Sequence, residues 1–182
     1  PVYSGSAINL WTPETGEVYA WTDAKVITEH LRSKARAQAR HTSSGFSGMS
    51  DEELAGDAAA PFLRPRIVFR NITNATNSRT VIVALAPPHV IPHHGAPYLL
   101  RRNGSLADEA YLLGVLSSRP LDWWARRHVE LNLTFSVLSA FPIPMVDEAH
   151  HQYAQEIQSI RLGRPEIHSL RKCESAGLYQ NL

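Results

Sequence analysis

The stretch that decides the fold reads Arg64-Pro-Arg-Ile-Val-Phe-Arg-Asn-Ile-Thr-Asn-Ala-Thr-Asn-Ser-Arg-Thr-Val-Ile-Val-Ala-Leu-Ala-Pro-Pro-His-Val90. Two segments of it, Ile67–Ile72 and Thr80–Leu85, are rich in β-branched and apolar residues, which is typical of strands. Amide, hydroxyl and guanidinium groups can contact base edges and phosphates. We therefore expect a recognition loop between the two strands, since the intervening side chains are nearly all hydrogen-bonding: Asn71, Thr73, Asn74, Thr76, Asn77, Ser78 and Arg79.

Charge is segregated along the chain. The net charge is only +1 over 182 residues, yet residues 62–127 hold nine arginines against three carboxylates. Arginine outnumbers lysine 15 to 3, and its planar guanidinium can pair with phosphate or guanine through two parallel hydrogen bonds. A GC-rich genome also favours arginine, so the clustering, rather than the total, indicates an anionic partner.

Several classes of protein are disfavoured by composition. The single Cys173 excludes an internal disulfide and a multi-cysteine zinc site, and it favours a reducing, cytoplasmic setting. No apolar run approaches the roughly 20 residues that a membrane span requires, so we expect no membrane partner. The chain opens at Pro1 without an initiator methionine, which indicates a fragment of a longer protein.

The remaining segments predict an α+β fold. Short strands are expected over Ile8–Trp11, Glu17–Trp21 and Leu131–Phe135. Ser50 is a predicted N-cap, and Ser105 with Asp108 forms a predicted capping box. A flexible linker is expected over 42–50 and a loosely ordered tail over 162–182. Helices are expected over 23–40, Asp51–Ala60, Leu106–Ser117, Leu121–Glu130 and Asp147–Arg161.

Three motifs, in this order, resemble a known family. Arg66 and Arg70 precede Thr76-Asn-Ser-Arg-Thr80; Tyr111-Leu-Leu-Gly-Val-Leu-Ser-Ser118 follows; and Leu131-Asn-Leu-Thr leads to Phe141-Pro-Ile-Pro144. Together they resemble the target recognition domain at the C-terminal end of adenine-specific DNA methyltransferases, including type IIG restriction-modification enzymes. The last motif also resembles the recognition domains of type I specificity subunits. The opening Tyr3-Ser-Gly-Ser-Ala-Ile8 looks like a weakened form of the family's Tyr-Glu-Gly-Lys-x-Ile.

The resemblance covers residues 1–161 and implies a specificity-domain-like α+β fold, with short, irregularly wound strands and a C-terminal helical segment. It implies sequence-specific recognition of double-stranded DNA on behalf of an adenine-N6 methyltransferase, in restriction-modification or phage defence. This chain lacks the family's Gly-rich methyl-donor loop and its Asn/Asp-Pro-Pro-Tyr/Phe motif. We therefore expect no catalysis here; S-adenosylmethionine and the catalytic domain that this module contacts belong to the parent protein, with or without an endonuclease.

Ten residues are predicted to contact DNA: Arg66, Arg70, Asn71, Asn74, Asn77, Arg79, His93, His94, Arg101 and Arg102. Each set has an alternative. Arg66 or Arg70 could instead anchor the loop by donating to the carbonyl groups of the loop backbone. The asparagines could form turns through their own backbone. We expect Asn74 to read a base and Arg79 to act as scaffold.

Other readings of the same residues remain open. One of Trp123 and Trp124 is expected in the core and the other partly exposed, where it could stack on a base. Arg126-Arg127 could contact DNA or form a solvated face. The central surface could instead dock on a protein partner, which would make the chain a protein-protein interaction module. A metal enzyme built on His93-His94 or His150-His151 with remote carboxylates is a further rival, although no third ligand lies at a usual spacing from His93-His94.

Overall fold

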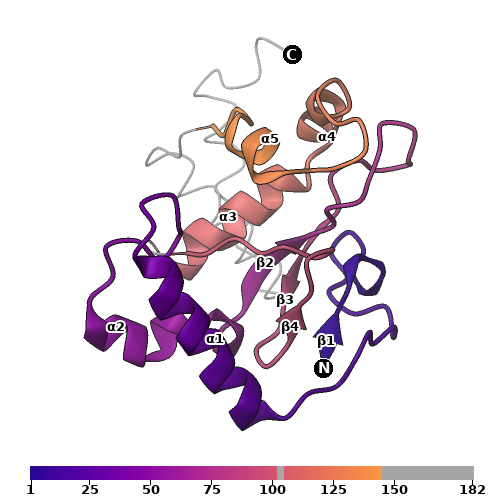
Figure 1. The fold of residues 1–182 in the computed structure, drawn as a ribbon. Helices are drawn as coiled ribbons and strands as arrows, with labels where there is room; N and C mark the ends of the chain where they lie inside the picture. The colour runs from indigo at the N-terminus through magenta and orange to yellow at the C-terminus, as the bar shows by residue number, and fades with distance from the viewer. Residues whose placement is uncertain (102–104, 145–182) are drawn as a thin grey trace, which may run out of the picture. The chain divides into compact units, whose positions relative to one another are not determined.

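The computed structural model describes residues 1–101 and 105–144 (Figure 1). The chain divides into two units, Pro1–Pro142 and Ile143–Leu182, and only Ile143 and Pro144 of the second are described. The predicted helix Asp147–Arg161, the tail over 162–182, the domain boundary at 161, Arg102 and His150-His151 therefore lie outside the described residues. Helices and small sheets occur together in the first unit, which confirms the α+β class. The specificity-domain architecture stays a prediction.

The central sheet overlaps the two predicted strands, but residues 70–72 and 80–82 lie outside the observed ones. Strand β2 (Arg66–Phe69) pairs antiparallel with β3 (Val83–Ala86), and Phe69 lies opposite Val83. The pairing continues past the strand ends, because the Arg70 N–H donates to the Ile82 carbonyl at 2.9 Å. On its other edge β2 bonds to residues 97–99, through Phe69 N–H to Pro97 O and Leu99 N–H to Ile67 O. Strand β2 is therefore hydrogen-bonded on both sides.

The N-terminal segment differs from the two strands expected there. Strand β1 (Val2–Tyr3) pairs in parallel with β4 (Ile91–Pro92), and a 3-10 turn, η1 (Gly5–Ala7), follows. The predicted strand Ile8–Trp11 is wrong, because the chain reverses at Leu10–Trp11 and Trp11 has a φ of 62°. Of the predicted strand Glu17–Trp21, only Ala20 makes a bridge, with Val2.

Helix α1 (Ala24–Ala39) begins at the predicted position, where Asp23 accepts hydrogen bonds from the next turn. Helix α2 (Asp51–Ala55) has the expected Ser50 cap, but it is shorter than predicted because Gly56 adopts an extended conformation. Two 3-10 turns follow, η2 (Asp57–Ala59) and η3 (Pro61–Leu63). Residues 42–50, expected as a flexible linker, form successive turns whose Phe46 and Met49 pack against the α1–α2 junction.

The C-terminal half of the unit is helical. Helix α3 (Leu106–Leu116) starts at the predicted capping box of Ser105 and Asp108. Helix α4 (Arg119–Ala125) is capped by Ser118 and has Pro120 in its first turn, where a helix does not need the missing N–H. The predicted strand Leu131–Phe135 reduces to a single bridge between Asn132 and Ile72. Thr134 then caps α5 (Phe135–Ser139), so the chain turns into a helix at Phe135.

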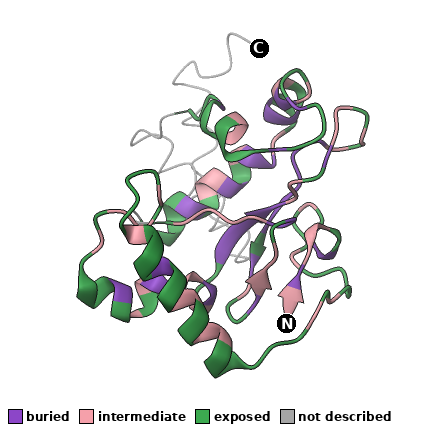
Figure 2. Ribbon diagram, in the orientation of Figure 1, coloured by how far each residue is buried: buried purple, intermediate pink, exposed green. Residues whose placement is uncertain are grey.

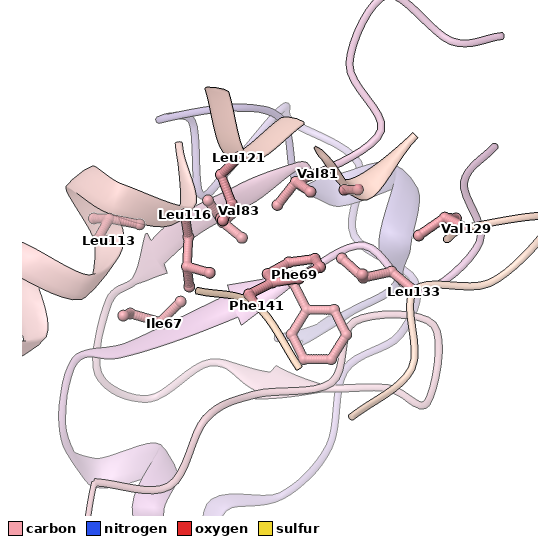
Figure 3. Packing of buried hydrophobic residues seen from close by; sticks show 11 residues of the cluster. Ile67, Phe69, Val81, Val83, Leu113, Leu116, Leu121, Val129, Leu133 and Phe141 are labelled. Atoms are coloured by element: carbon pink, nitrogen blue, oxygen red, sulfur yellow. The ribbon is translucent and has the colours of Figure 1, made fainter. Parts of the chain in front are cut away.

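The sheet is buried on both faces (Figure 2). Because side chains alternate along a strand, Ile67 and Phe69 point to one face and Val68 to the other, where it packs with Ile8, Ala84 and Ala86. The first face is the larger, and α3 and α4 cover it (Figure 3). Its buried cluster contains Ile67, Phe69, Val81, Val83, Leu113, Leu116, Leu121, Ala125, Val129, Leu133 and Phe141.

The packing of α3 on this face can be tested at Leu116, which is 1% exposed. Leu116→Ala should lower the free energy of unfolding by about 2–5 kcal/mol, because it removes buried methyl groups and leaves a cavity. Leu106→Ala in the first turn of the same helix is the matched control: Leu106 is 59% exposed, so its loss should cost no more than about 0.5 kcal/mol. Urea unfolding of both variants measures the difference, and equal losses would contradict the assigned core.

Candidate nucleic-acid interface

Residues 74–79 form the tip of the segment between β2 and β3, and two buried threonines link the two ends of this loop. The Thr73 hydroxyl donates to the Thr80 carbonyl at 2.8 Å, and the Thr80 hydroxyl donates to the Asn74 carbonyl at 3.0 Å. Both side chains are buried. Threonine therefore satisfies carbonyl groups that the strand ladder leaves unpaired at this point.

A buried carboxylate holds the C-terminal end of this loop. One oxygen of Asp122, on α4, accepts the backbone N–H groups of Thr80 at 2.8 Å and Val81 at 2.9 Å. Its other oxygen accepts Arg126 Nε at 3.1 Å, and Arg79 Nε lies 3.7 Å from the first oxygen. Asp122 is 3% exposed. Two guanidinium groups and two amides thus compensate a charge that would otherwise be costly to bury.

The same two arginines also bind the backbone. Arg126 donates to the carbonyl groups of Ala75, Asn77 and Ser78 at 2.7–2.8 Å. Arg79 donates to the carbonyl of Ser117, at the end of α3, and more weakly to that of Ser118. We call Asp122, Arg79 and Arg126 the Asp122 clamp. It fixes the backbone of the 74–79 loop from the α4 side, and the geometry of Arg79 is that of the scaffold expected from the sequence.

The asparagines of the loop mainly shape it. The Asn74 side-chain oxygen accepts the N–H groups of Thr76 and Asn77 and the hydroxyl of Thr76, at 2.7–3.0 Å. Reading adenine requires both the oxygen and the amide of an asparagine, so Asn74 could do so only by breaking this turn. The Asn77 amide donates to Thr73 Oγ1 at 3.2 Å. The contacts of Asn74 therefore match the turn alternative.

Asn71 lies just outside the loop and links three segments. Its N–H donates to Gly95 O at 3.1 Å, and its carbonyl accepts the Leu133 N–H at 2.8 Å. The side-chain oxygen is buried and makes no hydrogen bond to the described residues. Its backbone thus has a structural role, whatever the carboxamide contacts.

Arg66 lies in the interior, with 3% of its surface exposed. Its guanidinium donates to the carbonyl groups of Pro61, Arg64 and Val90, and it lies 5.2 Å from the centre of the Tyr98 ring. Burial lowers the pKa of Arg66 to about 10, with Tyr98 and Glu109 opposing the shift. The group is still charged at neutral pH, and its geometry matches the anchoring alternative rather than DNA contact.

Arg70 anchors the N-terminal segment to the end of β2. It donates to Gly5 O at 2.9 Å and to Ile8 O at 2.6 Å. The backbone at Gly5 lies close to that at Gly95, so that a Cβ added at Gly5 would be 2.7 Å from the Gly95 carbonyl oxygen. The Tyr3-Ser-Gly-Ser-Ala-Ile8 motif therefore meets the central motif through Arg70.

His93, His94 and Arg101, the other described residues of the predicted set, make their contacts outside the 74–79 loop. His93 stacks on Tyr19 at 4.7 Å, and the His94 ring lies 3.8 Å from that of His93. Arg101 Nε pairs with the buried carboxylate of Glu109 at 3.1 Å. Within residues 1–101 and 105–144, no group of three or more histidine, cysteine, aspartate or glutamate side chains could hold a metal ion.

Sequence reasoning missed Asp122 and left Arg126 undecided between DNA contact and a solvated face. The sequence does contain an indication of this pair: an aspartate four residues before an arginine, on a short helix with apolar neighbours, has the spacing of a helical ion pair. Trp123 is 58% exposed, which favours the exposed alternative, and Arg119 and Arg127 beside it are exposed as well. These three residues lie on α4 or directly after it, close to the clamped loop.

Comparison with protein-family models, curated proteins and solved structures finds no match to this chain. In the part of the chain that the structure describes, every helix is too short or too polar to cross a membrane.

The Asp122 clamp can be tested by removing its carboxylate. Asp122→Ala should lower the free energy of unfolding by about 3–5 kcal/mol, because two buried amides and two guanidinium groups lose their shared acceptor. Asp122→Asn should cost less, since an amide oxygen can still accept from Thr80 and Val81. Urea unfolding measures the loss, with the exposed Glu130→Gln as control. Unchanged hydrogen exchange at the Thr80 and Val81 amides in Asp122→Ala would contradict the clamp.

Proposed function

We propose that this chain is a sequence-specific recognition module for duplex DNA, which positions an adenine-N6 methyltransferase domain of its parent protein on a target site. The methyl transfer, with its S-adenosylmethionine, takes place in that separate domain. The order of the three motifs supports this proposal, as do the exposed arginines Arg119 and Arg127.

The observation that carries the proposal is the way in which the 74–79 loop is held. The Asp122 clamp binds its backbone from one side, while Thr76 and Ser78 are exposed on the loop. Discrimination between bases requires polar groups held in a defined position. A loop held by backbone contacts, with the Ser78 side chain in solvent, meets that requirement.

Docking on a protein partner is the second candidate, and a specific surface favours it. Ile72, Leu131 and Phe135 are 69%, 70% and 56% exposed. The bridge between Ile72 and Asn132 brings the first two close together, and Phe135 packs edge-on against Phe69. Exposed apolar side chains gathered in this way often mark a protein interface. The two functions are compatible, because a recognition module also has to contact its catalytic domain.

The proposed function predicts selective binding to duplex DNA. Selection of the chain against a pool of random duplexes at low salt should enrich one short sequence, because base contacts add to the non-specific attraction of phosphate. The enriched duplex should then bind more tightly than a scrambled duplex of equal length. Binding to neither duplex would refute the proposal and favour the protein-docking candidate.

Ser78 and Asn74 should behave differently once that target is known. Ser78→Ala should cost about 1–3 kcal/mol at a single base pair and leave the melting temperature unchanged, because its exposed hydroxyl is free to reach a base. Asn74→Ala should weaken binding to all sequences equally and lower the melting temperature, because the turn is lost. Binding across single-base variants of the target measures both, and loss of discrimination confined to Asn74→Ala would reverse these roles.

A further inference from the structure

Helix α4 presents one side that the clamp does not use. At 100° per residue, Arg119 and Trp123 fall on neighbouring lines of α4, beside the line of Arg126, and Arg127 lies in the turn directly after the helix. All three side chains are exposed. Arg126 joins α4 to the carbonyl groups of the 74–79 loop. The other three residues, which we call the α4 stripe, are thus carried by the segment that holds this loop.

Arg127 in this stripe is held by an aromatic ring. Its guanidinium lies 3.9 Å from the centre of the Trp123 ring, within the range of a cation–π contact. Such a contact occupies one face of the planar guanidinium and leaves its N–H edge able to donate. Less conformational freedom is then lost when that edge binds an anion, and the planar fork matches the oxygens of a phosphate.

The charge around the stripe is positive and uncompensated. Among the described residues, neither Arg119 nor Arg127 makes an ion pair. The one carboxylate of α4, Asp122, is already bound by Arg79 and Arg126. The next acidic residue along the chain, Glu130, lies beyond Arg127. The stripe therefore attracts anions, and its arginines are not engaged in the clamp.

We propose that the α4 stripe binds the phosphodiester backbone of the nucleic acid whose bases the 74–79 loop contacts. This inference rests on the proposed function and adds a second, sequence-independent contact to it. Arg119 and Arg127 each neutralise one phosphate, and Trp123 orients Arg127. Contacts of this kind fix the register of a protein on a duplex without reading its sequence.

The test is the salt dependence of binding to a labelled duplex of random sequence, followed by fluorescence anisotropy. The double variant Arg119→Ala/Arg127→Ala should reduce the slope of log K against log salt by about 1.8, since each neutralised phosphate contributes about 0.9. It should weaken binding to target and scrambled duplexes by the same factor. The matched control is Lys25→Ala/Arg36→Ala, which removes the same charge from exposed positions on α1, on the other side of the unit (Figure 1).

The possible results of this binding experiment distinguish failure of the proposed function from failure of the phosphate contact. Wild-type chain that binds no duplex at low salt would refute the proposed function and this inference together. Duplex binding with an unchanged slope in the α4 variant would refute this inference alone. Equal slope changes in the α4 and α1 variants would show that net charge, and not the stripe, governs binding. Tighter binding to polyglutamate than to duplex would replace DNA by an acidic protein partner.

Trp123 gives a readout that a merely structural role would not produce. Binding of duplex should change the tryptophan emission of the wild-type chain, because phosphate approaches the Trp123–Arg127 pair. That change should be absent in Trp123→Phe, whose ring can still stack with Arg127 and which should keep its affinity. An identical emission change in Trp123→Phe would show that Trp123 does not lie at the contact.

Discussion

The carboxylate of Asp122 is the constraint on which the central part of this structure depends. A charge buried in a protein interior is tolerated only where hydrogen-bond donors and opposite charges surround it. Here the donors are the amides of Thr80 and Val81 before β3, the guanidinium of Arg79 in the loop and that of Arg126 at the end of α4. Moving any one of these elements would leave the carboxylate partly uncompensated, so their mutual positions are defined together.

Arginine has a use in this chain that its surplus alone does not reveal. Short strands and 3-10 turns leave many backbone carbonyl groups without a partner in a ladder or a helix. Arg66, Arg70, Arg79 and Arg126 donate to such carbonyl groups, which in the case of Arg70 lie more than 60 residues away in sequence. Arginine side chains therefore supply hydrogen bonds that the irregular backbone does not make with itself.

Local features were predictable and long-range ones were not. The N-cap at Ser50, the capping box at Ser105 and the strands on either side of the polar loop were found, because the residues that specify them lie within a few positions of one another. The reversal at Trp11 was missed, because its apolar residues alternate like those of a strand. In the candidate site, Arg79 binds backbone carbonyl groups, as the prediction of a scaffold role requires. Asn74 was assigned to DNA because an asparagine in a turn and an asparagine on a base look alike in sequence.

The clamp binds the 74–79 loop and the two residues after it mainly through their main chain: the carbonyl groups of Ala75, Asn77 and Ser78 and the amides of Thr80 and Val81. Main-chain groups are present whatever side chain a position carries. Position 78 is exposed, so it can be exchanged with little effect on folding. The loop is thus organised for divergence: new side chains can be sampled at this position by single mutations, on a backbone that does not have to be rebuilt each time.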